Sequence, residues 1–136
     1  MLRYLLDTNV VSQPASKMPA AGVVRRLLAS SAQCAIPAPA WHELHFGCKR
    51  MPAGKRREAL EDYLADVVRA FDILPYDAKA AKLHATERAR LEGLGITVPF
   101  VDGQIAAIAQ ANELILVTAN VRDFEPFTAL AVEDWT

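Results

Sequence analysis

Short runs of apolar residues alternate along this chain with longer stretches in which apolar residues recur every three or four positions. A short run of this kind is typical of a strand buried on both faces, and the longer spacing is typical of an amphipathic helix. The runs predict strands at Leu2–Leu6, Gln33–Ile36, Phe71–Leu74 and Leu114–Val117, and an edge strand at Leu130–Val132. The longer stretches predict helices over Ala20–Ser30, from about Ala40, over Lys55–Ala70, over Asp77–Leu94 and over Asp102–Asn112.

The apolar positions also indicate which helix faces turn inward. In two of the predicted helices these positions are Val23, Val24, Leu27 and Leu28, and Leu60, Leu64, Val67 and Val68. Strands that alternate with helices favour parallel pairing, because each helix returns the chain to the other end of the sheet. We therefore expect an α/β fold, a three-layer α/β/α sandwich around a central mostly parallel sheet, formed by a single domain over residues 1–136.

Composition narrows the class of protein. The chain has 136 residues, of which 52% are hydrophobic and 23% charged, so it can bury a core and is not a disordered chain. Its net charge of −1 excludes a protein that holds nucleic acid by overall charge alone. An RNA substrate would have to be held by a local basic patch, a metal ion or a second subunit.

Cysteine content and hydropathy indicate the compartment. Cys34 and Cys48 are too few for a disulfide framework and lack zinc-finger spacing, so we expect two buried thiols in a reducing compartment. The first apolar run meets Asp7 too early for a signal peptide, and no stretch is long enough to span a membrane. We expect a cytoplasmic protein without membrane attachment.

Four acidic residues lie where the predicted elements begin or end. Asp7 follows the first strand, Glu43 lies in the first turns of the helix after the second, Asp102 opens a helix, and Asp123 follows the fourth strand. Ligands of parallel sheets bind beyond the carboxyl ends of the strands, so all four could meet at one edge. Carboxylates crowd together only where a cation neutralises them, and hard oxygen ligands suit Mg²⁺ or Mn²⁺. The pattern predicts metal-dependent hydrolysis of phosphodiesters.

Each carboxylate also has a simpler explanation. Asp7 and Asp102 could merely cap a turn or a helix, as Asp often does. Asp123 has charged neighbours in the sequence and could simply be solvated. Glu43 is the more suggestive residue, because it lies on a helix of largely apolar and aromatic residues, where an unpaired carboxylate is costly. The combination of carboxylates in buried segments is what favours a metal site.

These acidic residues belong to segments that resemble one known family. The segments are Leu5–Asn9, Trp41–Leu44 with Gly47, Asp102–Ala109 and Leu116–Phe124. In their order and spacing they resemble the PIN-domain ribonuclease toxins of the VapC type, including the FitB-like branch. The resemblance covers essentially the whole chain. Its motifs are short individually and specific as a set.

The resemblance implies a Rossmann-like sandwich and an endoribonuclease that depends on Mg²⁺, with Mn²⁺ as a substitute. It assigns Asp7, Asp102 and Glu43 to the metal site. Asp7 and Asp102 would bind the ion directly, whereas Glu43 and Asp123 would hold its waters or a second ion. Asp123 matches the acid before Phe124, although some members of the family place this acid at the position of Asn120.

The resemblance also assigns polar residues and partners. Thr118 and Asn120 match the polar positions after the fourth strand, where they could hydrogen-bond the scissile phosphate or orient an aspartate. The implied partners are an RNA substrate, a second copy of the chain in a homodimer, and a small cognate antitoxin. Contact with DNA would occur only through that antitoxin.

Two further groups of residues leave alternatives open. The basic residues near Glu43 are Lys49, Arg50, Lys55, Arg56 and Arg57. They could be a solvated helix start or a rim that grips an RNA backbone. His42 and His45 lack a third ligand and the spacing of zinc peptidases, so exposed or hydrogen-bonded histidines are expected.

Two other functions fit parts of the pattern. An aspartyl phosphatase also begins with an apolar strand that ends in Asp, but it usually needs a second Asp two residues later, where this chain has Asn9. A binding module would form a DNA-binding complex with an antitoxin and keep a weak or latent nuclease. The intact set of carboxylates favours an active enzyme over this binding module.

Overall fold

The computed structural model describes all 136 residues and has a parallel sheet as its middle layer. The strands are β1 (Tyr4–Leu6), β2 (Cys34–Pro37), β3 (Asp72–Leu74), β4 (Ile115–Val117) and β5 (Val132–Glu133). Their order across the sheet is β3-β2-β1-β4-β5, and every neighbouring pair is parallel. The predicted parallel sheet is thereby confirmed, and all of it is parallel.

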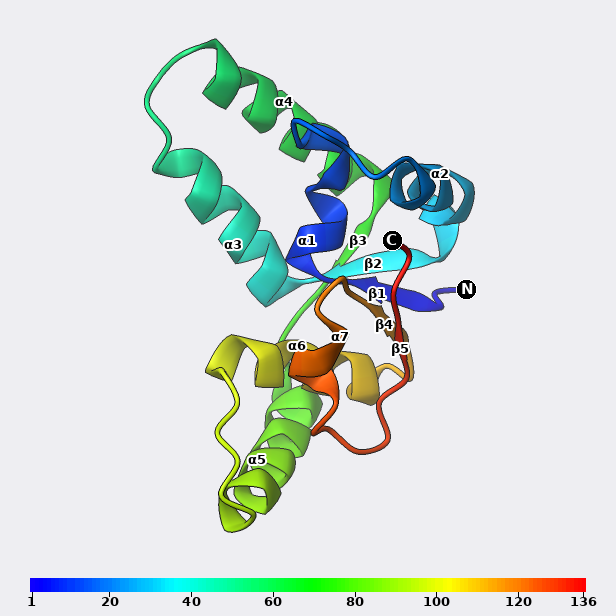
Figure 1. Ribbon diagram of the computed structural model, residues 1–136, viewed down its shortest axis with the longest axis vertical. Helices are drawn as coiled ribbons and strands as arrows, with labels where there is room; N and C mark the ends of the chain where they lie inside the picture. The colour runs from blue at the N-terminus through cyan, green and yellow to red at the C-terminus, as the bar shows by residue number, and fades with distance from the viewer.

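Helices cover both faces of this sheet (Figure 1). One face carries α1 (Thr8–Val11), α2 (Ala21–Ser30), α3 (Ala38–Lys49) and α4 (Lys55–Ala70), with short 3-10 helices η1 (Gln13–Ala15) and η2 (Ser31–Gln33). The other face carries α5 (Ala78–Gly93), α6 (Phe100–Ala111) and α7 (Val121–Phe124). The three-layer α/β/α sandwich is therefore confirmed. None of the helices is both long and apolar enough to cross a membrane.

The core lies between the central strands and the helices packed on them. Leu5 and Leu6 of β1 and Leu116 of β4 are completely buried, as a strand covered on both faces requires. On α6 the residues from Ile105 to Ala109 are buried without interruption, and three of these five are alanines. Such small side chains allow α6 to lie close to the sheet.

The strand order places a topological switch between β1 and β4. The chain runs outward from β1 through β2 to β3, and then returns to pair β4 with the other side of β1. Leu6 pairs with Val117, so the residues that follow them, Asp7 and Thr118, leave the sheet side by side. The carboxyl ends of strands at such a switch form the usual ligand-binding crevice of an open α/β sheet.

Several predicted boundaries and faces were wrong. The helix predicted from Asp102 begins at Phe100, directly after Pro99, so Asp102 is its third residue and does not open it. The edge strand is Val132–Glu133, and the short helices α1 and α7 were not predicted. Leu28 and Val68, expected to face inward, are 77% and 48% exposed, because α2 and α4 lie on the outside of their layer and bury only a narrow stripe.

Candidate active site

Asp7 is a buried carboxylate at the carboxyl end of β1, with only 8% of its surface exposed. Its Oδ1 accepts a hydrogen bond from the backbone N–H of Thr8 (2.8 Å), which caps α1. Its Oδ2 accepts one from the Thr118 hydroxyl (2.9 Å) at the end of β4. Burial raises the pKa of Asp7 above its ordinary value, and these hydrogen bonds only partly oppose the rise.

Asn9 locks the segment after β4 against α1. Its side-chain NH₂ lies 3.4 Å from both Asp7 Oδ2 and the Thr118 hydroxyl, and its Oδ1 accepts from the backbone N–H of Ala119 (3.0 Å). The Thr118 hydroxyl also accepts from the N–H of Asn120 (3.1 Å). Sequence reasoning gave Asn9 no role. The signal was present, since an Asn two residues after an Asp in a turn supplies both donors and an acceptor.

Asp102 is partly buried in the first turn of α6. Its pKa is raised to about 6, first by burial and then by the negative charges of Asp7 and Asp123. Asp7 and Asp102 are absent from the ion pairs of the structure, so no Lys or Arg neutralises them. The two carboxylates, one after β1 and one on α6, therefore repel each other at the switch point.

The residues after β4 complete this edge of the sheet. Asp123 lies on α7 and is exposed, yet its charge raises the pKa of both Asp7 and Asp102. Thr118 is fully buried, whereas Asn120 is exposed at the start of α7. Asp7, Asp102 and Asp123 therefore lie close enough for their charges to interact, at the edge where the sequence predicted that all four acidic residues could meet.

Glu43 differs from this group. Its side chain is 45% exposed, and its neighbour is His42, whose Nδ1 lies 3.8 Å from Glu43 Oε1. It is not among the charges that shift the pKa of Asp7 or Asp102. The inference that Glu43 lies in an apolar environment was wrong, because α3 buries the stripe of Ala40, Leu44 and Cys48 and leaves Glu43 beside it. Its role at the metal stays a prediction.

The donor set fits a hydrated divalent cation. No group of three His, Cys, Asp or Glu side chains is placed to hold an ion by itself. Mg²⁺, however, usually keeps several waters and binds through one or two carboxylates. Asp7 and Asp102 provide two hard oxygen donors whose mutual repulsion a cation would relieve. His42 is 73% exposed and does not extend this site.

The raised pKa of Asp102 leads to a stability prediction. The folded state binds the Asp102 proton more tightly than the unfolded chain does, with a pKa of about 6 against 3.8. The stabilisation from this proton is complete below pH 3.8 and is lost as the pH rises through about 6. In the metal-free protein at pH 8, Asp102→Asn should therefore raise the free energy of unfolding, by about 1 kcal/mol after solvent screening.

Urea unfolding at pH 8 and at pH 4 measures this effect, and the gain should shrink at the lower pH. Asp62→Asn is the matched control, because Asp62 is exposed on α4 and takes part in none of the ion pairs. An Asp102→Asn protein no more stable than wild type at pH 8 would contradict the repulsion described above.

Comparison with known proteins gives the family. The PIN domain family model matches residues 4–128. The tRNA(fMet)-specific endonuclease VapC of Shigella flexneri is 33% identical over 136 residues, with 100% of each chain covered. The crystal structure of FitAcB from Neisseria gonorrhoeae has 30% identity and a TM-score of 0.87, covering 95% of each chain.

A second complex, VapBC2 from Rickettsia felis bound to a DNA fragment from its promoter, has 26% identity and a TM-score of 0.86. That likeness covers 99% of this chain and 100% of the other. Family model, full-length relatives and fold agree with the motifs around Asp7 and Asp102. The chain belongs to the PIN-domain family, among the VapC-like toxins of the VapBC and FitAB toxin–antitoxin systems.

Proposed function

We propose that this protein is a divalent-metal-dependent endoribonuclease that acts as the toxin of a toxin–antitoxin pair. The observation that carries the proposal is the pair of carboxylates at the switch point, Asp7 and Asp102, which repel each other and have no basic partner. A full-length relative that is an endonuclease specific for a tRNA supports RNA as the substrate class. An aspartyl phosphatase loses support, because Asn9 is occupied in hydrogen bonds to the 118–119 segment.

Asp7 and Asp102 would hold Mg²⁺ or Mn²⁺ directly. When bound, the ion would lower the pKa of a water molecule and neutralise charge that develops on the phosphate. Thr118, after β4, and Asn9, on α1, both donate to Asp7 Oδ2 and so restrain the orientation of this carboxylate. Asp123 and Glu43, which are both exposed, would hold water molecules of the ion and would not bind it directly.

The two polar residues after β4 have different tasks. The Thr118 hydroxyl donates its proton to Asp7 and accepts a hydrogen bond from the Asn120 N–H. Its only proton is therefore used to orient the aspartate. The Asn120 side chain is exposed and makes no capping hydrogen bond. We assign Thr118 to positioning Asp7 and Asn120 to contact with the scissile phosphate.

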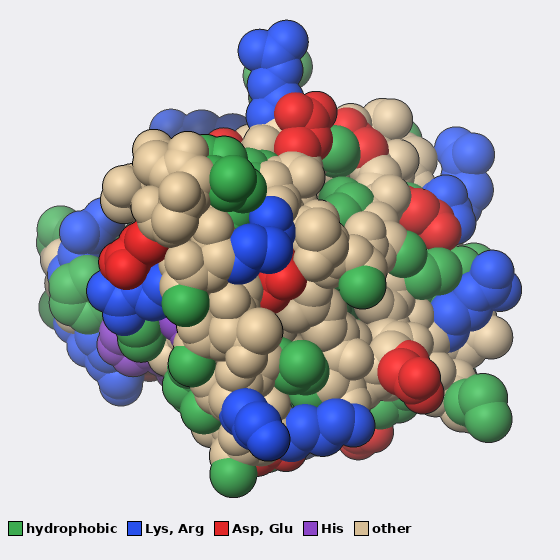
Figure 2. All heavy atoms as spheres, turned by 90° about the horizontal axis from the view of Figure 1, so that it is seen from below, with side chains coloured by type: hydrophobic (Ala, Val, Ile, Leu, Met, Phe, Trp, Pro, Cys, Tyr) green, Lys and Arg blue, Asp and Glu red, His purple; other side chains and the backbone are tan.

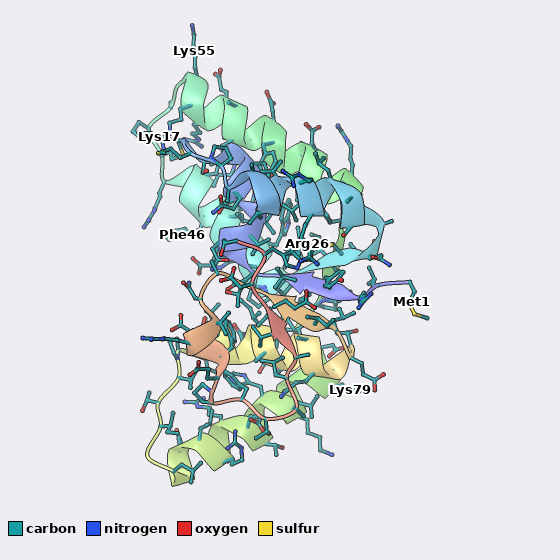
Figure 3. All side chains as sticks on the ribbon, turned by 45° about the vertical axis from the view of Figure 1, so that its right-hand side comes forward. Met1, Lys17, Arg26, Phe46, Lys55 and Lys79 are labelled. Carbon is teal, nitrogen blue, oxygen red and sulfur yellow. The ribbon has the colours of Figure 1, made fainter.

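Basic side chains offer a path for the RNA backbone. Figure 2 shows Lys and Arg side chains around a histidine at its left edge, where the α3–α4 hairpin projects. Phe46 of α3 lies on the side of the molecule where the strands end (Figure 3). Lys55, at the start of α4, projects outward from the hairpin, away from the sheet. The guanidinium of Arg50 lies 5.3 Å from the centre of the Phe46 ring, so Arg50 is the member of this group that we assign to the substrate backbone.

The catalytic prediction concerns the two inner carboxylates. The wild-type protein should cleave RNA with Mg²⁺ or Mn²⁺, lose this activity in EDTA and regain it when the ion is restored. Asp7→Asn and Asp102→Asn should each reduce the rate by at least about a hundredfold, because each removes a direct metal ligand. Cleavage of an RNA pool, followed by gel and sequencing of the new ends, measures this.

Asp62→Asn again serves as the control and should cleave like wild type. Circular dichroism and thermal unfolding confirm that the Asn variants are folded, as relief of repulsion predicts. Undiminished cleavage by folded Asp7→Asn and Asp102→Asn proteins would overturn the assignment, and cleavage that persists in EDTA would overturn the metal dependence.

A protein antitoxin is the second part of the proposal. The similar structures include a toxin–antitoxin complex, and one such complex is bound to promoter DNA. In this chain an apolar cavity of about 260 Å³ opens between α2 and α4, and Leu28 on its wall is 77% exposed. Such a surface suits the apolar segment of an antitoxin. DNA contact would then occur through the antitoxin. A homodimer of this chain would carry two copies of the antitoxin.

Expression of the toxin alone should arrest growth, and co-expression with a small neighbouring antitoxin gene should restore it through a complex that elutes as one species in size-exclusion chromatography. Leu28→Asp should weaken that complex while RNA cleavage continues, because a charge enters the apolar groove. Leu94→Asp is the control, since Leu94 is 64% exposed at the end of α5. Harmless expression of an RNA-cleaving protein with no antitoxin partner would contradict the toxin role.

A further inference from the structure

His84 is a buried polar residue that has no role in the active site described above. It lies on α5 with 5% of its surface exposed and faces the first turn of α6. Its Nδ1 is 2.8 Å from the Tyr76 hydroxyl, and its ring centroid is 4.8 Å from that of Phe100. The ring therefore joins the segment after β3 to the turn that carries Asp102.

Gly103 is the point of contact between this ring and α6. A Cβ at Gly103 would overlap His84 Nε2 and would lie only 2.8 Å from His84 Cδ2, closer than real Cβ atoms approach a neighbour. The imidazole thus fills the space that a side chain at position 103 would need. Gly is unfavourable inside a helix, so its presence here is explained by this close approach and not by helix propensity.

The imidazole is held as a rigid spacer. Burial lowers the pKa of His84, and the charge of Arg88 lowers it further, so both favour the neutral ring. One ring nitrogen is fixed by Tyr76, and Phe100 packs against the ring at a tilt of 59°. A ring fixed on these sides sets how closely the start of α6 approaches α5.

We propose that His84 is a positioning residue that places the Asp102 carboxylate for metal binding. Gly103, which the ring supports, is the residue next to Asp102. Metal–ligand distances tolerate only about ±0.2 Å, so a small shift of this turn changes the fit of Asp102 to an ion that Asp7 holds from β1. The proposal rests on the proposed function, since it concerns the same metal site.

A size exchange between the two positions tests it. Gly103→Ala should push the turn outward, and His84→Ala should leave it unsupported, so each should weaken Mn²⁺ binding roughly tenfold. The double variant His84→Ala/Gly103→Ala should bind Mn²⁺ within about threefold of wild type, because the new methyl group occupies space that the ring has left. Electron paramagnetic resonance of free Mn²⁺ measures the dissociation constant without reference to catalysis.

Leu64→Ala is the control for a merely structural role. Leu64 is fully buried on α4, on the opposite face of the sheet, so its truncation should lower thermal stability and leave Mn²⁺ affinity unchanged. Weaker Mn²⁺ binding in the single variants, recovery in the double variant and no change in Leu64→Ala support the proposal. If Gly103→Ala does not fold, the comparison of His84→Ala with Leu64→Ala decides.

Three results would overturn the positioning role. They are wild-type affinity in folded His84→Ala and Gly103→Ala, an equal loss in Leu64→Ala, and a double variant no better than Gly103→Ala. Asp102→Asn separates this failure from failure of the proposed function. If Asp102→Asn loses Mn²⁺ while His84→Ala keeps it, only the positioning role falls. If the wild-type protein binds no Mn²⁺, both fall together.

Discussion

The hydrogen bond between the Thr118 hydroxyl and the buried Asp7 carboxylate is the interaction on which the site depends. It joins the ends of β1 and β4, the two strands that meet where the direction of the chain across the sheet reverses. Because both strands are apolar and covered on both faces, the first polar side chains after them are forced into the same small space. Asn9 then ties the next residues to α1 and completes a frame around one carboxylate.

This frame holds a negative charge where the fold would be more stable without it. Burial raises the pKa of Asp7, and the pKa of Asp102 rises to about 6 partly because Asp7 is near. No basic side chain offsets either charge. Perturbed carboxylates of this kind are typical of functional sites, and a hydrated divalent cation is the ligand that we propose to relieve the repulsion. The membership of the chain in the PIN-domain family agrees with that use.

The sequence was sufficient to predict the sheet and the layers, and insufficient to predict the environment of individual side chains. Apolar runs locate strands because burial on both faces leaves a continuous signal, and strand ends then locate Asp7 and Thr118. Glu43 was misjudged because the composition of a helix does not say which of its faces packs, and α3 leaves Glu43 outside its buried stripe. His84 and Gly103 lie on different helices, so no pattern in the local sequence could predict their contact.

Crowding of carboxylates at the switch point raises the pKa of Asp102, and we infer that a divalent cation relieves this crowding. A carbon-13 NMR titration of the Asp102 side-chain carboxyl, with and without Mg²⁺, tests this most directly. We expect a pKa of about 6 for Asp102 in the metal-free protein and a clear fall in this pKa when Mg²⁺ is added. A pKa near the ordinary 3.8 that does not respond to Mg²⁺ would contradict it.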